Sequence, residues 1–510
     1  MATPLRYALS ALCCGAMLLI YLPLFPAVAF LRPAFIPENW HLLMDEPQFS
    51  QALSATLISS FIAVGGALTL TLIMITALWP SSGWERLAAR LPLLLALPHV
   101  AFATSALLLF AEGGVIYRLI PVLHALPDRY GVGLGLVLAV KESAFLLWVS
   151  WAALGEKQLG EQLIVLRSLG YSRGQCLRYL ILPTLMPALS MALLATTAWT
   201  LSVVDVAIVL GPGNPPTLAV LAWQWLNQGD ETAQIKGQLT CIVLLMLLAV
   251  LALSAYLLWH TGQRFFPGLH GRRHVQTSLL SGTIASQLIP LSGLFSTLTL
   301  VLLARATLPD GLVFSNSVWL ALWASLLGAA LCLLWLEWGP SALTRCLWLP
   351  LILPALPLAA GQYEIALYGW LDGQFPTVLW GHLLWVIPWM LFILRPAWQR
   401  IDSRQVLIAR TLGWQQTRIF LQIKCPLIIK PLLSALAVGF SVSIAQYLPT
   451  QWLGAGRIPT LTTEAVALSS GSASAQLATQ GLWQLILPVL FFTFTAILAR
   501  TIGHYRQGLR

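Results

Sequence analysis

Long apolar runs, separated by short polar segments, are the feature that most constrains how this chain folds. A helix needs about 20 apolar residues to cross roughly 30 Å of hydrocarbon, and twelve stretches meet that requirement. Because the runs are continuous rather than alternating, they favour helices and exclude a closed β-barrel. The sequence therefore predicts an all-α polytopic membrane protein with about twelve transmembrane helices. The predicted spans lie near residues 7–31, 54–79, 92–111, 132–153, 183–210, 238–260, 285–305, 316–337, 346–368, 377–395, 426–449 and 481–500.

The composition agrees with this class. Of the 510 residues, 58% are hydrophobic and only 9% are charged, whereas a soluble protein carries about 25% charged residues. The net charge of +10 is typical of basic cytoplasmic loops, and no basic-aromatic patch predicts a nucleic-acid partner. The lipid bilayer is thus one expected partner. The pattern Ala27-Val28-Ala29 leaves a cleaved signal peptide as an alternative for the first span.

The distribution of Lys and Arg predicts the orientation. Most of the 28 Lys and Arg fall in inside segments when the N-terminus is placed in the cytoplasm. The opposite orientation would invert that bias, so both termini are expected in the cytoplasm of a bacterial inner-membrane protein. The basic residues left in outside segments are Arg32, Arg118, Arg129, Lys236, Arg305 and Arg457.

One polar sequence segment occurs twice in the chain. VLRSLGYSRGQCLRYLILP at 165–183 and IARTLGWQQTRIFLQIKCP at 408–426 share Arg-[Ser/Thr]-Leu-Gly and a Pro 13 residues after the Gly. LGPGNPPTL at 210–218 and LGAGRIPTL at 453–461 match at the same offset of 243. An earlier block matches at an offset of 263, pairing Ser54, Gly65 and Ala67 with Ser317, Gly328 and Ala330. The chain is therefore predicted to contain two parallel six-helix repeats.

These features predict a division of the chain into six parts. The two repeats form the domains 54–260 and 316–500, and a basic segment joins the halves. The remaining parts are membrane helices, a loop and a tail. In order, the parts are 1–53 (first membrane helix and outside loop), 54–260, 261–284 (cytoplasmic linker), 285–315 (seventh membrane helix), 316–500 and 501–510 (cytoplasmic tail).

The duplicated loop is expected to form a helix–turn–helix on the cytoplasmic face. Gly170 can end the first helix in the left-handed conformation, and Ser172 with Gln175 can cap the second. Pro183 suits the first turn of the following span. An amphipathic loop touching anionic lipid is the alternative. The duplication favours docking of a two-fold symmetric cytoplasmic partner.

The spacing of these loops resembles the loop motif of permeases in binding-protein-dependent ABC importers. That motif is Glu-Ala-Ala, three residues, Gly, nine residues, Ile, one residue and Leu-Pro. The resemblance covers about 54–260 and 316–500 and is closest to the fused double permeases of thiamine and ferric-iron importers, with the type I, MetI-like fold. The matching positions are Gly170, Leu180, Leu182 and Pro183, then Gly413, Ile423, Cys425 and Pro426.

The resemblance implies that each loop docks on one of two copies of a cytoplasmic ABC ATPase, and that an extracytoplasmic solute-binding protein delivers the solute. The motif Glu is replaced by Ile164 and Leu407, which shifts the expected contacts to neighbouring side chains. Those contacts are Arg167, Leu169, Arg410 and Leu412. The implied function is the permease subunit of an ATP-driven importer for a small solute such as thiamine, iron or a polyamine.

The chain is not expected to be an enzyme. It has no G-x-x-x-x-G-K-[ST] phosphate loop, so ATP is expected on partner subunits and no cofactor on this chain. No catalytic constellation or metal-ligand spacing is apparent. The alternative function is a twelve-helix ion-coupled secondary carrier of the major-facilitator type. Such a carrier would place its basic signature between spans two and three, where this chain has only PSSGWERLAAR (80–90).

Ionisable residues within predicted spans are costly and often functional, and three of them are candidates for the transport pathway. Lys141 and Glu142 fall near the middle of the fourth span, where they could line a pathway or gate, or form an internally paired polar spot. Asp205 follows Pro183 by 22 residues, about 33 Å along a continuous helix, which places it near the outer surface. There it could face a cationic substrate or be an exposed helix-end acid. Its repeat position is Leu448.

Overall fold

The computed structural model describes residues 3–29, 31–111, 114–120, 128–155, 157–265, 280–304, 308–471 and 473–507. Most of the predicted linker (266–279) and the end of the tail (508–510) lie outside the described residues. The described residues form helices and connecting turns, with no strand among them. This confirms the all-α class that the sequence predicts.

Each half begins with a leading helix and continues with the repeated unit. The helices of the first half are α1 (Thr3–Tyr21), α2 (Leu24–Ala29), η1 (Arg32–Phe35), α3 (Pro37–Met44), α4 (Phe49–Leu78), α5 (Ser82–Ala96), α6 (His99–Phe110), α7 (Val115–Leu119), α8 (Val132–Leu154), α9 (Lys157–Ser168), α10 (Arg173–Cys176), η2 (Leu177–Ile181), α11 (Leu182–Ser202), α12 (Asp205–Leu210), α13 (Leu218–Leu226) and α14 (Glu231–Phe265).

The second half repeats this order, with an additional break at Ile428 between its last short helices and the following span. Its helices are α15 (Leu280–Leu303), α16 (Gly311–Trp338), η3 (Ser341–Trp348), α17 (Leu349–Ile352), α18 (Ala355–Tyr368), α19 (Phe375–Gln399), α20 (Ser403–Thr411), α21 (Gln416–Ile419), η4 (Phe420–Lys424), α22 (Cys425–Leu427), α23 (Ile429–Ile444), α24 (Leu448–Gly454), α25 (Leu461–Ser469) and α26 (Ser474–Gln507).

The described part of the chain has nine helices long and apolar enough to cross a membrane, or up to eleven if each of two bent pairs is one span. The bent pairs fall on the predicted spans 346–368 and 426–449, with bends of 105° and 77°. The first predicted span, 7–31, is divided between the shorter apolar helix Tyr7–Tyr21 and the six-residue helix α2. About twelve apolar segments are therefore present, but three are not single long helices.

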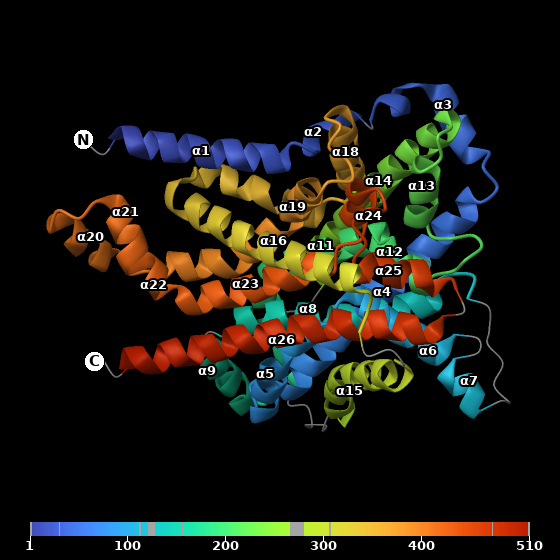
Figure 1. The fold of residues 1–510 in the computed structure, drawn as a ribbon. Coiled ribbons are helices and arrows are strands. Elements are labelled where there is room, and N and C mark those ends of the chain that lie inside the picture. Colours follow the sequence, from blue (N-terminus) through green and yellow to red (C-terminus); the bar gives the residue numbers. More distant parts are fainter. Residues whose placement is uncertain are drawn as a thin grey trace.

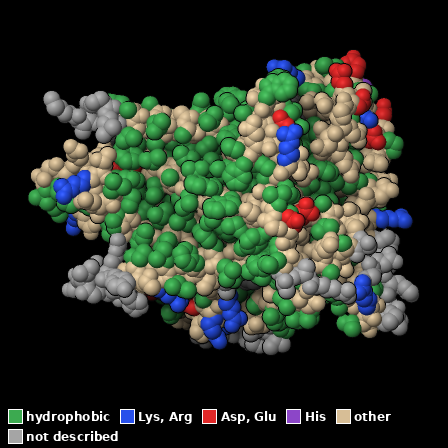
Figure 2. Space-filling view, in the orientation of Figure 1, with side chains coloured by type: hydrophobic (Ala, Val, Ile, Leu, Met, Phe, Trp, Pro, Cys, Tyr) green, Lys and Arg blue, Asp and Glu red, His purple; other side chains and the backbone are tan. Residues whose placement is uncertain are grey.

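The main helices run side by side between two ends of the molecule (Figure 1). The start of α1, the end of α26 and the α20–α21 loop lie at one end, and α3, α7 and α13 lie at the other. Between them, hydrophobic side chains form a broad band across the visible face, and most acidic side chains on that face lie toward the α3 end (Figure 2). This is the surface expected of a protein surrounded by lipid.

In each half, the third apolar segment is interrupted at an equivalent Leu-Pro pair. α5 and α6 are separated at Leu97-Pro98, and α17 and α18 at Leu353-Pro354, with Leu97 and Leu353 in extended conformations. A proline disfavours helical geometry in the residue before it and lacks the N–H that would continue the helix. The predicted span 92–111 is therefore not one continuous helix, and the same holds for 346–368.

Two hydrogen bonds confirm the repeat and correct part of its register. The N–H of Leu218 donates to Thr56 Oγ1 at 2.8 Å, and the N–H of Leu461 donates to Ser317 Oγ at 2.9 Å. Leu218 and Leu461 keep the predicted offset of 243. Thr56 and Ser317, however, pair at an offset of 261. The match of Ser54 with Ser317 is therefore two residues out of register, since similar small residues recur along both helices.

Each leading helix lies against the opposite half. On α1, Tyr21 donates to the carbonyl of Leu347 at 2.9 Å, and the carbonyl of Leu19 accepts from Trp380 Nε1 at 3.1 Å. On α15, the Ser296 hydroxyl bonds that of Ser105 in α6 at 2.7 Å. The two halves are thus interlocked by their first helices.

Adjacent glycines in α4 provide a matched test of close helix packing. A Cβ added to Gly66 would lie 2.8 Å from the Cβ of Ala139 in α8, whereas one added to Gly65 meets nothing within 4 Å. We expect Gly66→Leu to destabilise the protein by about 1–3 kcal/mol, because overpacking forces the helices apart. Gly65→Leu should leave the melting temperature in detergent close to that of the wild type. Equal effects of the two substitutions would contradict this packing.

Candidate functional site

The two duplicated loops have the predicted helix–turn–helix form. In the first loop, α9 ends before Gly170, whose φ is +91°, and Ser172 and Gln175 form a capping box at the start of α10. In the second, Gly413 has a φ of +79° between α20 and α21. The left-handed glycine therefore sets the same reversal of direction in both halves.

The helix after each turn contains one wide turn at the same repeat position. These π-helical segments are Leu177–Ile181 and Phe420–Lys424, and each is followed by a proline, Pro183 or Pro426. A proline has no N–H to donate to the preceding turn, which explains why the regular ladder is interrupted there. In the first half the helix continues from Arg173 through Pro183 rather than beginning there.

Each loop presents apolar side chains to solvent at matching positions. Leu169 is 63% exposed and its counterpart Leu412 is 70% exposed. Exposed apolar side chains that recur at one spacing indicate a surface that contacts another protein or lipid. The four further members of this set, which we call the loop patches, are Ile164 and Val165 on α9 and Leu407 and Ile408 on α20.

The predicted loop residues divide into two groups. Arg410, Leu412 and Gly413 are exposed at the second loop, and Leu169 is exposed at the first, with Arg167 and Gly170 partly buried. The others lie nearer the membrane helices: Leu182, Cys425 and Pro426 are partly buried, and Pro183 is exposed. The structure therefore brings the Arg and Leu positions, but not the Leu-Pro positions, to the tips of the loops.

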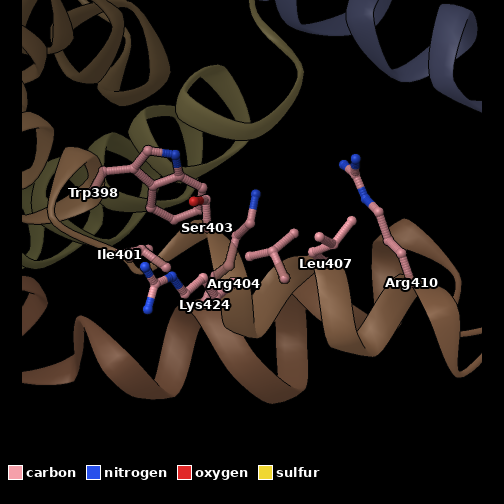
Figure 3. A pocket seen from close by; sticks show the side chains of 8 residues that line it. Trp398, Ile401, Ser403, Arg404, Leu407, Arg410 and Lys424 are labelled. Carbon is pink, nitrogen blue, oxygen red and sulfur yellow. The ribbon is translucent and has the colours of Figure 1, made fainter.

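A hollow of about 460 Å³ lies beside α20. Figure 3 shows Leu407 and Arg410 rising from this helix, with Trp398 on the opposite side of the view. The remaining lining residues are Ile401, Ser403, Arg404, Val406 and Lys424. The hollow is open, basic and partly apolar.

Both loops are fastened to the end of the long helix that opens their own repeat. In the first half, Arg173 Nη1 donates to the carbonyl of Ala77 at 2.9 Å. In the second, Gln416, at the repeat position of Arg173, donates to Glu337 Oε1 at 2.9 Å. Lys424 completes the second fastening through a 2.6 Å ion pair with Glu337 Oε2. The Glu337 side chain is only 1% exposed, so this is a buried pair.

A second cluster of polar side chains, which includes His99 and Glu142, lies where the two halves of the molecule meet. We call this surface the seam. Here α6 and α12 contact α25, α11 contacts α17 and α18, and rings of α8 contact rings of α19. His99 Nε2 lies 2.7 Å from Glu142 Oε1, and the His99 ring packs against that of Trp199 in a tilted arrangement, with centroids 4.2 Å apart. Glu142 is therefore paired with His99, a partner that the sequence did not indicate.

The structure places Asp205 differently from the sequence prediction. The helix α11 ends at Ser202, Val203 is extended, and Asp205 begins the short helix α12. Asp205 is partly buried and lies within electrostatic reach of His99 and of Tyr447 in the second half. It is therefore neither 33 Å along one helix nor an exposed helix-end acid.

Lys141 is buried and lies within electrostatic reach of its neighbour Glu142. Its side chain lines a small cavity with Leu97, Phe102 and Ile289, on the side of α8 that faces α15. No group of three His, Cys, Asp or Glu that could hold a metal ion occurs within the described ranges.

The comparisons with known proteins decide the family. The chain is 57% identical over 511 residues to the inner membrane ABC transporter permease protein YnjC of Escherichia coli (strain K12), and the match covers 100% of both chains. The chain belongs to the ABC transporter permeases. It is also 27% identical over 97 residues to the spermidine/putrescine transport system permease protein PotC homolog of Mycoplasma genitalium, covering 19% of this chain and 34% of that one. No protein-family model and no solved structure matches.

Membership of this family settles the broad function. The chain is a multi-pass inner-membrane permease subunit of an ABC importer, a transport component rather than an enzyme, and the major-facilitator alternative is not favoured. An ABC permease works with other ABC transporter components, an ATPase and a binding protein.

Sequence reasoning missed Glu337, Lys424 and His99 in this permease. Glu337 could have been noticed as an acid at the end of an otherwise apolar run.

Proposed function

We propose that this permease imports a small solute by ATP-driven alternation, with two copies of a cytoplasmic ATPase docked on the loop patches. Three pairs of exposed apolar residues at one offset support this stoichiometry, because two equivalent surfaces fit two equivalent partners. Arg410 lies beside the second patch and offers a basic contact there, while Leu407 stands at the position of the motif acid. ATP binds the partner subunits, and an extracytoplasmic binding protein supplies the solute at the opposite end.

The single observation that carries this proposal is the repeated exposure of Leu169 and Leu412. Co-expression of the permease with the ATPase encoded beside it should yield a complex with two ATPase subunits for each permease, measured by native mass spectrometry. Leu169→Asp combined with Leu412→Asp should abolish the complex. Trp370→Asp, a control at the other end of the molecule where Trp370 is 86% exposed, should not. A wild-type permease that retains no ATPase would refute the proposal.

The proposed orientation has a separate test. Cys346 is the exposed thiol among the cysteines, and it follows α16 at the end where the loops lie. A membrane-impermeant maleimide should label Cys346 in inside-out vesicles but not in intact spheroplasts. A cysteine introduced by Trp370→Cys, in a Cys346→Ser background, should show the reverse pattern. Labelling of Cys346 from the outside would place the loops and both termini outside the cytoplasm.

A further inference from the structure

The two docking loops differ at the hollow beside α20. Val406 and Lys424 line this hollow of about 460 Å³, and their counterparts at the offset of 243 are Leu163 and Ile181. Leu163 and Ile181 are each only 3% exposed and belong to one apolar cluster, whereas Val406 and Lys424 are partly exposed. Among the described residues, the first loop therefore packs an apolar core where the second loop leaves an open, basic surface.

The two loops also carry opposite charges at one exposed repeat position. Arg404 on α20 corresponds to Glu161 on α9, whereas Arg410 keeps its charge in the first half as Arg167. Leu407 lies one turn after Arg404 and one turn before Arg410, because residues three apart are neighbours on a helix surface. The second loop patch is therefore flanked by two bases, and the first by an acid and a base.

The hollow stays positive when the nearby acids are counted. Its bases are Arg404, Arg410 and Lys424. Glu337 is paired with Lys424, and the Asp402 carboxylate accepts from the N–H of Arg404 at 2.9 Å at the start of α20. These two acids leave an excess of one positive charge. Neither Arg404 nor Arg410 forms an ion pair within the described part of the chain, so both guanidinium groups are available to a partner.

We propose that the hollow receives an acidic side chain of one ATPase subunit, so that the second loop binds its ATPase subunit more tightly than the first loop does. This inference rests on the proposed docking of two ATPase copies and adds the partner's chemistry at that site. Leu407 belongs both to the loop patch and to the lining of the hollow (Figure 3). A protein that covers the patch therefore also reaches the hollow.

Two identical ATPase subunits present the same residue to both loops, and this makes the two docks unequal. At the second loop the carboxylate can pair with Arg404, whereas at the first loop it meets Glu161 and is repelled. The hollow also offers the Trp398 ring, which lies 5.1 Å from Lys424 Nζ and excludes water from one side. A charge pair across a protein interface commonly changes affinity by about tenfold or more, which sets the expected difference between the docks.

Photo-crosslinking at two repeat positions tests this inequality. Val165 and Ile408 are 56% and 59% exposed, so p-benzoylphenylalanine introduced at either position reports on equivalent surroundings. The full-length permease in phosphatidylcholine nanodiscs is mixed, without ATP, with less than one equivalent of the ATPase encoded beside it. Each yield is divided by the yield at saturating ATPase. Because each ATPase subunit then chooses between two loops, crosslinking from position 408 should exceed that from position 165 about tenfold.

Charge variants identify the cause of the bias. Arg404→Glu should bring the crosslinking ratio close to one, and Glu161→Arg should lower it by strengthening the first dock. Arg500→Glu is the matched control, because Arg500 is exposed on α26 at the same end of the molecule, and it should leave the ratio unchanged. Should Arg404→Glu fail to fold, the wild-type protein in about 500 mM NaCl provides the same test, since salt screens exposed charge pairs.

The outcomes separate this inference from the proposed function. A wild-type ratio near one, or a ratio unchanged by both Arg404→Glu and salt, would overturn the unequal docks while ATPase binding to both loops stands. Absence of crosslinking from both positions at saturating ATPase would refute the proposed docking itself. A bias that disappears when phosphatidylglycerol replaces part of the phosphatidylcholine would assign the hollow to a lipid headgroup and would also overturn the proposal.

Discussion

Replacing Gly413 with valine is expected to abolish transport while the protein still inserts into the membrane. Gly413 has a φ of +79°, and a Cβ added there meets nothing within 4 Å, so the substitution acts through the backbone rather than through a clash. A non-glycine residue in this conformation costs roughly 1–2 kcal/mol, and a β-branched residue costs more. The turn should open and the second loop patch should lose its position. Solute uptake into cells and the amount of inserted protein are the measurements.

Asparagine is the matched control, because its short side chain tolerates the left-handed conformation. Gly413→Asn should therefore retain most uptake. Gly170, with a φ of +91°, should show the same contrast between valine and asparagine in the first half. Loss of uptake with both substitutions would mean that the glycine contacts the ATPase directly and that its backbone conformation is not the cause.

Breaking the buried Glu337–Lys424 pair is the second change with a large expected effect. In Glu337→Gln, Lys424 keeps its positive charge in a site where its side chain is 15% exposed, without the carboxylate 2.6 Å away. Removing one partner of a buried ion pair costs about 3–5 kcal/mol. The second loop should detach from the end of α16, and ATP hydrolysis should continue with little uptake. The measurement is the ratio of solute transported to ATP hydrolysed in proteoliposomes.

The double substitution Glu337→Gln with Lys424→Met provides the control, since it removes both charges together. It should restore much of the coupling ratio that Glu337→Gln alone loses. Arg173→Gln in the first half, where a single hydrogen bond to the Ala77 carbonyl does the fastening, should have a smaller effect. A coupling ratio unchanged by Glu337→Gln would show that the pair does not position the loop.

The periodic and repeated features could be predicted from the sequence, and the breaks within the spans could not. Apolar length located the twelve segments, and the glycine and proline spacing located the loops. Proline did not identify the breaks, because Pro187, Pro290, Pro388 and Pro488 lie inside helices while Pro98 and Pro354 follow breaks. Neighbouring helices can satisfy the backbone groups that a proline frees, and that depends on packing rather than on local sequence.

The side-chain contacts at the seam could not be predicted from the sequence either. His99 and Glu142 are 43 residues apart, and Tyr447 reaches Asp205 from the other half. Such contacts depend on the orientation of each helix about its own axis relative to its neighbours, which hydropathy does not encode. The misplacement of Asp205 has the same origin. Counting residues along one helix assumed continuity through Val203, where the chain is extended.

The crossed leading helices restrict how the halves can move. Because α1 lies on the second half and α15 on the first, sliding the halves apart would pull each helix from its hydrogen-bonded contacts at Leu347 and Ser105. The two halves are therefore tied together on opposite sides, and separating them requires breaking both contacts.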